Sequence, residues 1–220
     1  YVPNAPLAPL VTGASCESCT AVTGSPISSA LTDATGAFRL DNVPVGSNVP
    51  LVIQVGKWRR EVRIPSVAPC ADTRLSDREL TRLPRNQREG NLPKIGLATG
   101  GADALECLLR KIGIDEAEFT PVSGSGRVNL FAGFEGTAAY APALNGGASL
   151  PPATALWDDV RTLEKYDVVL LDCEGSESET KKTKGAAALA AMAAYTNLGG
   201  RVFATHWHNH WLEGGPQPLP

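Results

Sequence analysis

The chain has 220 residues, of which 43% are hydrophobic and 20% are charged, and its formal net charge is −3. This composition is typical of a globular protein rather than a disordered one, and the length allows one large domain or two ordinary ones. A weakly acidic chain gives no electrostatic reason to expect nucleic acid or an anionic membrane as a partner. Because no apolar stretch approaches the ~18 residues that cross a bilayer, we expect no transmembrane segment.

The first 72 residues contain short stretches that alternate between apolar and polar residues. Asp33 and Gly36 bound a turn between two predicted strands, residues 27–32 and 37–40, because Asp and Gly suit a hairpin that needs a positive φ. Residues 49–55 and 61–64 alternate in the same way. Several short strands separated by turns predict a β-sandwich.

The motifs of this region are specific. They are Thr23-Gly24-Ser25-Pro26-Ile27, residues 32–40 and Val43-Pro44-Val45-Gly46. On these motifs, residues 1–72 resemble the carboxypeptidase regulatory-like domain, a transthyretin-like β-sandwich. The resemblance implies a non-catalytic accessory domain of a secreted or surface protein. The chain departs from that family in its Cys16-x-x-Cys19 loop and in the cluster Lys57-Trp58-Arg59-Arg60. This cluster is either a ligand-binding patch or a solvated hairpin end with a packed tryptophan.

Five cysteines suggest that a disulfide forms. Cys16, Cys19 and Cys70 supply three thiols without a nearby histidine, one ligand short of a structural zinc site. We therefore predict a disulfide from Cys70 to Cys16 or Cys19, and an extracytoplasmic location, whether secreted, periplasmic or anchored to the surface by a lipid. The odd number leaves at least one thiol that is free or paired with a segment outside this sequence. The chain starts without methionine and stops soon after an apparent strand end, so we also expect it to be a trimmed piece of a longer precursor.

The periodicity changes after a polar linker over residues 73–92, in which residues 77–82 could form a helical turn. The expected elements that follow are a strand at 94–99, a helix at 102–112 ended by Gly113, a strand at 166–172, a helix at 185–198 and a strand at 201–205. Residues 121–156 are rich in Gly, Ala and Pro and read as a long irregular insertion. This order predicts an α/β domain over residues 93–220, a three-layer parallel sheet that could be incomplete at the C-terminus.

Parallel sheets bind ligands at the carboxyl ends of their strands. That rule gathers three segments at one edge: Gly100-Gly101 with Asp103, Asp172-Cys173-Glu174, and residues 205–210. The two glycines and Asp103 could bind a ligand, with backbone N–H groups holding an anion, although a tight turn needs glycine as well. Cys173 could be a nucleophile, with His206 as its base and Glu174 or Asp172 orienting the histidine. The alternative is a buried thiol, or a disulfide from Cys173 to Cys107.

All three histidines, His206, His208 and His210, lie within five residues. Neutral imidazole is a common ligand of zinc and copper, so the three rings could hold such a metal, with Asp103 or Glu174 completing the shell. Extended chain would direct all three rings to one side, whereas a helix would pair only His206 with His210. Trp207 and Trp211 alternate with them and favour a different role, in which the histidines are hydrogen-bonded spacers. We expect His206 at the cleft formed by the carboxyl ends of the strands. The histidines there either bind a metal or serve as hydrogen-bonded spacers.

The strand 166–172, the alanine-rich helix, the stretch 198–203 and His206 together are similar to the class I glutamine amidotransferase-like fold, above all to its trehalose-utilisation (ThuA-like) branch. The resemblance covers residues 93–212. An amidotransferase has its nucleophilic cysteine after the last of these strands, where this chain has Thr205-His206-Trp207, and no later His-x-Glu pair follows. The resemblance therefore implies the fold without the reaction.

The whole chain is similar to uncharacterised two-domain secreted or lipid-anchored proteins of predatory soil bacteria. We expect a secreted or cell-surface binding or structural protein with a catalytically degenerate α/β domain, whose partner would be a protein or glycan surface. The alternative is a hydrolase of unknown substrate that uses Cys173 or a histidine-bound metal. Reaction with a thiol probe and a metal analysis would discriminate between the two.

Overall fold

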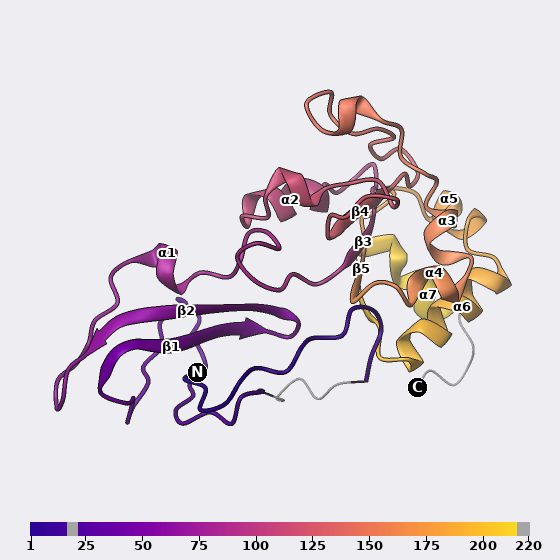
Figure 1. Cartoon of the computed structure of the whole chain (residues 1–220). Coiled ribbons are helices and arrows are strands. Elements are labelled where there is room, and N and C mark those ends of the chain that lie inside the picture. Colours follow the sequence, from indigo (N-terminus) through magenta and orange to yellow (C-terminus); the bar gives the residue numbers. More distant parts are fainter. Residues whose placement is uncertain (17–21, 215–220) are drawn as a thin grey trace. The chain divides into compact units, whose positions relative to one another are not determined.

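The computed structural model describes residues 1–16 and 22–214. Their contacts group them into two compact units. Unit 1 comprises the described residues of 1–10 and 18–92, and unit 2 comprises those of 11–17 and 93–220. Figure 1 follows the chain through both units by colour.

Unit 1 is organised around an antiparallel hairpin of β1 (Gly46–Val55) and β2 (Trp58–Val67). Gly56 has a φ of 55° in the two-residue turn, a conformation that hairpin turns require and that glycine adopts without strain. Leu51 pairs with Val62 across the ladder, and their buried side chains pack with Val2. The helix α1 (Arg78–Thr81) begins at Asp77, whose side chain accepts a hydrogen bond from the Glu79 N–H.

The predicted fold class, a β-sandwich domain followed by a three-layer α/β domain, is wrong. In the part of the chain that the structure describes, the antiparallel strands form one two-stranded sheet, and the other sheet is the four-stranded parallel one of a single small α/β domain. The turn at Asp33 forms, since the Asp33 carboxylate accepts hydrogen bonds from the N–H groups of Thr35 and Ala37. Its two arms do not become strands. In the first arm, Ile27 is 47% and Leu31 95% exposed, so this arm has no buried apolar face with which to form a sandwich layer. In the second arm, Phe38 and Leu40 are only partly buried against the core of unit 1.

Unit 2 contains a parallel sheet in the order β4-β3-β5-β6. Its strands are β3 (Ile95–Ala98), β4 (Val128–Phe131), β5 (Val168–Leu171) and β6 (Arg201–Ala204). Three of them lie within the strands expected from the sequence. The fourth, β4, lies in the segment 121–156 that we read as irregular, and all four of its residues are buried.

Short helices and turns connect the strands of unit 2. They are α2 (Leu105–Lys111), η1 (Glu116–Glu118), η2 (Asn145–Gly147), α3 (Thr154–Trp157), α4 (Val160–Leu163), α5 (Glu177–Lys182), α6 (Ala186–Asn197), η3 (His206–Asn209) and α7 (His210–Glu213). Figure 1 shows α2 on one side of the strands and α3, α4 and α6 on the other. The helix α6 agrees with the predicted one, whereas α2 begins later than predicted and leaves Leu108 and Ile112 exposed.

The core of unit 2 lies between the sheet and the helices α3, α4 and α6. Its largest fully buried side chains include Trp157, Tyr166 and Tyr195, each no more than 1% exposed. Tyr195 donates its hydroxyl hydrogen to the carbonyl oxygen of Tyr166 at 3.1 Å, so the buried hydroxyl has a partner. Trp157 also packs edge to face on Trp211, with ring centroids 5.5 Å apart. This packing fixes the chain that follows β6, which contains the histidines.

Cys16 and Cys70 are free and exposed, so the predicted disulfide between them does not form. Cys19 lies outside the described residues. Cys107 and Cys173 are also free, so the alternative disulfide between these two is wrong as well. The four cysteines that the structure describes therefore give no support to an oxidising compartment, and the predicted location stays a prediction.

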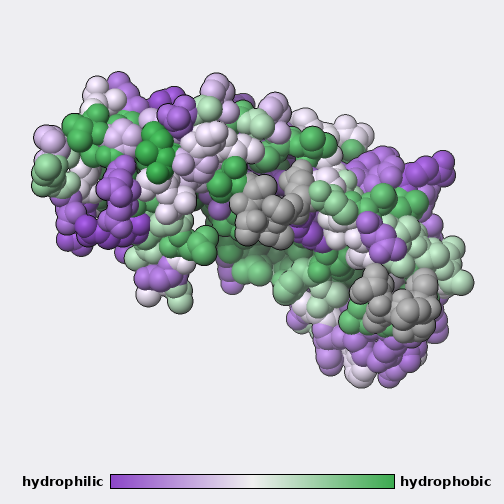
Figure 2. Space-filling model, turned by 90° about the horizontal axis from the view of Figure 1, so that it is seen from below, coloured by the Kyte–Doolittle hydropathy of each residue, from purple (hydrophilic) through white to green (hydrophobic). Residues whose placement is uncertain are grey.

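Among the described residues, the helices are all too short or too polar to cross a membrane. Apolar side chains nevertheless reach the surface, and Figure 2 shows green areas on one face of the molecule. Exposed examples are Val55 in unit 1 and Phe203 in unit 2.

Candidate thiol–imidazole site

The candidate site lies where β5 and β6, neighbouring parallel strands, end at the same edge of the sheet. Cys173 follows β5, and His206 follows β6. The Cys173 Sγ lies 3.2 Å from the His206 Nδ1. Cys173 is only 2% exposed, whereas His206 is exposed. The edge therefore places a buried sulfur under a surface imidazole, at a distance that allows proton transfer between them.

The backbone at His206 has an unusual conformation. Its φ is +42°, which residues with a side chain adopt at a cost of about 1–3 kcal/mol. The chain reverses direction here, because Thr205 still pairs with β5 through its N–H and the Leu171 carbonyl, and η3 begins at the next residue. The imidazole also lies against the Trp207 ring, with centroids 4.6 Å apart. The strained turn and this ring contact together hold the imidazole over Cys173.

Asp103 connects the two strand ends. Its Oδ2 accepts a hydrogen bond from the Cys173 N–H at 3.2 Å and another from the Thr205 hydroxyl at 2.5 Å. The same carboxylate oxygen thus fixes the backbone of the thiol residue and the residue before the histidine. On the other side, the Gly175 N–H points to the Cys173 Sγ at 3.4 Å, so the sulfur has a second polar neighbour besides His206.

Gly100 and Gly101, in the turn after β3, are needed for close packing. A Cβ on Gly100 would lie 2.3 Å from the Cys173 carbonyl oxygen, and one on Gly101 would lie 2.7 Å from the Glu135 side chain. The Gly101 N–H donates to the Phe134 carbonyl oxygen, so it is already used within the protein. These contacts favour the interpretation that Gly100 and Gly101 are present because the turn is tight, rather than to bind an anion. They place the turn in contact with the Cys173 backbone.

Asp172 and Glu106 form a pair of carboxyl groups beside the site. Asp172 is 0% exposed, and its Oδ2 accepts a hydrogen bond from the Leu105 N–H at 3.1 Å. Its Oδ1 and the Glu106 Oε2 are both buried without a hydrogen-bond donor in the described structure. Burial and the neighbouring Glu106 carboxyl raise the pKa of Asp172 to about 8. Asp172 is therefore protonated at neutral pH and can donate a hydrogen bond, rather than being the ionised group that was one candidate to orient His206.

Glu174 is occupied by a buried ion pair. Its Oε2 lies 2.9 Å from the Lys184 Nζ, and its Oε1 accepts a hydrogen bond from the Phe134 N–H. Both side chains are at most 2% exposed. The Lys184 ammonium also lies over the Trp157 ring, 4.6 Å from its centroid. Both carboxylate oxygens of Glu174 therefore have partners other than His206, and the carboxylate stabilises the loop after Cys173.

His208 is a structural histidine. Its Nδ1 accepts a hydrogen bond from the Trp211 Nε1–H at 3.1 Å, so its Nε2 carries the proton and donates to the Asp172 carbonyl oxygen at 2.8 Å. Burial, and secondarily the Lys184 charge, lower its pKa to about 4. The imidazole is neutral at physiological pH, and both of its nitrogens are used.

The predicted metal ligands do not come together. The chain turns through η3 and α7 instead of staying extended, so His206, His208 and His210 point to different neighbours. Gly214 lies against the His210 ring, where an added Cβ would be 2.8 Å from the Cε1. Within residues 1–16 and 22–214, the side chains of His, Cys, Asp and Glu form no cluster of three or more that could hold a metal ion.

Comparison with known protein families, with curated proteins and with solved structures finds no match for this chain. The two resemblances drawn from sequence motifs thus remain predictions, and the sandwich fold that the first one implies is absent from the described residues.

Sequence reasoning missed Lys184 and Glu106 as members of this edge. Lys184 stands before the alanine-rich helix at the end of a polar loop, where a lysine usually lies in solvent. Glu106 lies one turn into the predicted helix, three residues after Asp103. Its partner Asp172 follows a different strand, so no local spacing in the sequence signals this acidic pair.

Proposed function

We propose that the protein is a cysteine-dependent enzyme in which Cys173 is the nucleophile and His206 its general base. The observation that carries the proposal is the 3.2 Å contact between the Cys173 Sγ and the His206 Nδ1 at the carboxyl edge of the parallel sheet. This is the spacing that an activated thiol needs from its base. The conformational strain at His206 supports the proposal, because strained residues concentrate at functional sites.

The chemistry that suits this pair is acyl transfer to water. The His206 Nδ1 takes the thiol proton, and the thiolate attacks a carbonyl carbon. The proton on Nδ1 then passes to the leaving alcohol, thiol or amine, and a thioester forms on Cys173. In the second half, His206 takes a proton from water, hydroxide cleaves the thioester, and the thiol is restored with release of a carboxylic acid. The N–H of Gly175 stabilises the sulfur's negative charge in the first step.

The burial of the sulfur restricts the substrate. Cys173 is 2% exposed and its Sγ contacts the exposed His206 ring, so we infer that the electrophile reaches the sulfur beside the imidazole. A small, unhindered acyl group suits this geometry better than an acyl chain of a folded protein. Asp103 acts as a positioning residue, since it contacts the backbone of Cys173 and the hydroxyl of Thr205.

The experiment is alkylation of the folded protein with iodoacetamide at pH 7, with the reacted cysteines identified by peptide mass spectrometry. Peptide mapping is needed because Cys16, Cys70 and Cys107 are exposed and react as well. In the His206→Gln variant we expect the alkylation rate of Cys173 to fall by at least about tenfold, because the thiol loses its base. The matched control is His210→Gln, in which a neighbouring histidine changes and the Cys173 rate stays the same. Equal Cys173 rates in all three proteins would contradict the proposal.

A second candidate is the binding or structural role, at the cell surface, that the sequence favoured. Its support is that the polar groups beside Cys173 are largely satisfied within the protein: Glu174 by Lys184, and His208 by Trp211 and Asp172. In that case Cys173 is an inert buried thiol. The same alkylation experiment distinguishes the two candidates, because an inert thiol reacts slowly whether or not His206 is present.

A further inference from the structure

Unit 1 contains a cavity of about 440 Å³ that the proposed enzymatic function does not use. It is lined by residues of the N-terminal segment, β2 and the loop before residue 92, namely Leu7, Arg59, Glu61, Gln87, Arg88, Glu89, Gly90 and Asn91. The volume is that of a site for a small molecule, and the lining is strongly polar. Arg59 belongs to the basic-aromatic cluster in which the sequence suggested a ligand-binding patch.

Arg59 is a buried cation whose partners are all neutral. It is 5% exposed, and its guanidinium donates to the Ala8 carbonyl oxygen, the Thr23 hydroxyl and the Asn91 side-chain oxygen. None of these oxygens carries a charge. A buried charge is normally paired with an opposite one, because removing it from water is costly. Three of the five N–H groups of the guanidinium are used, so two have no hydrogen-bond partner among the described residues.

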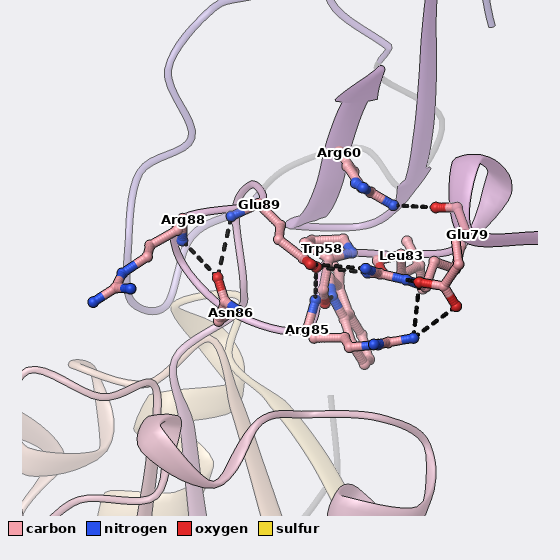
Figure 3. A network of polar contacts seen from close by, with 10 residues as sticks. Trp58, Arg60, Glu79, Leu83, Arg85, Asn86, Arg88 and Glu89 are labelled. Atoms are coloured by element: carbon pink, nitrogen blue, oxygen red, sulfur yellow. Dashed lines mark hydrogen bonds and ion pairs between the residues drawn. The ribbon is translucent and has the colours of Figure 1, made fainter. Parts of the chain in front are cut away.

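The two carboxylates of the lining are paired with arginines outside it. Glu89 forms a bidentate pair with Arg82, at 2.5 and 2.7 Å, and also accepts the N–H of Arg85. Figure 3 shows this network, in which Arg85 also reaches Glu79. Glu61 lies 2.8 Å from Arg63. The negative charges around the cavity are thus largely compensated.

Arg88 provides a second, uncompensated positive charge. The Asn86 side chain holds the Arg88 backbone by accepting its N–H at 2.9 Å, while the Arg88 side chain extends away from the network in Figure 3. Within the described residues its guanidinium has no hydrogen-bond or ion-pair partner. Between residues 57 and 91, nine Lys and Arg stand against five Asp and Glu, in a chain whose net charge is −3.

We propose that this cavity, the Arg59–Arg88 pocket, binds an oxyanion group, a carboxylate or a phosphate, through the guanidinium groups of Arg59 and Arg88. Guanidinium groups present parallel N–H donors that match both oxyanions. The loop that carries Arg88 is held in place before binding, since Glu89 and Asn86 fix its backbone and the Trp58 Nε1–H donates to the Pro84 carbonyl oxygen at 2.7 Å. A preformed site loses less entropy on binding.

The test is isothermal titration of the whole chain with two probes, inorganic phosphate and citrate, at constant ionic strength. We expect saturable binding of one equivalent of at least one probe at millimolar concentrations. Arg88→Gln should weaken that binding by at least about tenfold, because it removes a charge-assisted contact. Arg74→Gln is the matched control: it removes the same charge from an exposed position of unit 1 outside the cavity, and should leave the dissociation constant within about twofold.

A second variant, Arg59→Lys, keeps the positive charge but removes the fork, and should also weaken binding. If this variant loses its near-ultraviolet circular dichroism because Arg59 is needed for folding, Arg88→Gln still decides the matter. Tighter binding of phosphate would indicate a phosphorylated ligand, and tighter binding of citrate a carboxylated one. The proposal is overturned if neither probe binds saturably, or if Arg74→Gln and Arg88→Gln weaken binding equally, which would indicate non-specific charge attraction.

Discussion

Replacing Asp172 by Asn should make the protein more stable at pH 8 and change the pH dependence of its unfolding. The side chain is fully buried, its Oδ1 has no donor, and the pKa of Asp172 is raised to about 8 by burial first and by Glu106 second. An unfolded carboxyl group ionises near pH 4. Between these values the folded protein holds a proton that the unfolded chain has lost, so the free energy of unfolding falls as the pH rises.

The magnitude follows from proton linkage. Each pH unit in this interval lowers the free energy of unfolding by ~1.4 kcal/mol, so the stretch from pH 6.5 to 8 costs the wild-type protein about 2 kcal/mol. The asparagine side chain does not ionise in this pH range. Its side-chain oxygen can still accept the Leu105 N–H, and its amide can donate to the unpartnered Glu106 oxygen. The variant's unfolding free energy should therefore lack this contribution.

The assay is urea unfolding at pH 5.5, 6.5 and 8, followed by tryptophan fluorescence. Three of the four tryptophans, Trp157, Trp207 and Trp211, belong to unit 2. The stability difference between Asp172→Asn and the wild type should grow by about 2 kcal/mol from pH 6.5 to 8. Glu106→Gln is the control variant, and it should reduce the wild-type slope without abolishing it. Parallel stability curves for the wild type and Asp172→Asn would refute the reasoning, since Asp172 would then be ionised in both states.

Three further predictions concern the same edge. Burial lowers the pKa of His208 to about 4, below its unfolded value near 6.5. In Asp172→Asn, which no longer has the Asp172 titration, the free energy of unfolding should therefore fall by ~1.4 kcal/mol per pH unit as the pH drops from 6.5 to 4. A free energy of unfolding that does not change over this range would contradict this. Lys184→Met should lower the free energy of unfolding, measured in urea, by about 3–5 kcal/mol, because it leaves the buried Glu174 charge unpaired. Lys182→Met, at an exposed position of α5, is the control and should lower it by less than about 0.5 kcal/mol. Gly100→Ala should lower stability by about 1–3 kcal/mol through the clash with the Cys173 carbonyl, while Gly185→Ala, in open space, should cost no more than about 1 kcal/mol.

The strands of unit 2 could be predicted where the sequence has continuous apolar runs. β5, β6 and the helix α6 are such runs, and Gly199 and Gly200 separate α6 from β6. β4 could not be recognised, because its four residues include Asn129 and lie within a stretch rich in Gly, Ala and Pro. Asn129 is buried because its amide donates to the carbonyl oxygens of Thr120 and Pro121. Such a partner cannot be read from local sequence.

The sandwich predicted for unit 1 is wrong because its local patterns do not reveal tertiary packing. Alternation and turn residues were correctly recognised at Asp33 and in the hairpin of β1 and β2, but alternation does not reveal whether a second layer exists to cover a strand. Leu31 alternates as a strand residue would and is 95% exposed. The resemblance to a sandwich family rested on these same turn motifs.

The place of the candidate site could be predicted from the sequence, but not which of its side chains form hydrogen bonds and ion pairs with one another. The rule for carboxyl ends of parallel strands identified the segments that contain Cys173 and His206, which the structure brings within 3.2 Å of each other. Which carboxylate contacts which group depends on tertiary packing. Glu174 pairs with Lys184 across a loop of ten residues, and Asp103 binds Thr205, which lies about a hundred residues later in the chain.

The most direct test of the central claim, that Cys173 is a nucleophile activated by His206, is to trap the acyl enzyme. The protein is mixed with p-nitrophenyl acetate, quenched in acid, and the modified peptide is identified by mass spectrometry. The proposal predicts an acetyl group on the Cys173 sulfur in the wild type, a much slower appearance of that group in His206→Gln, and none on residue 173 in Cys173→Ala. Acetylation confined to Cys16, Cys70 and Cys107, with Cys173 unmodified, would contradict it.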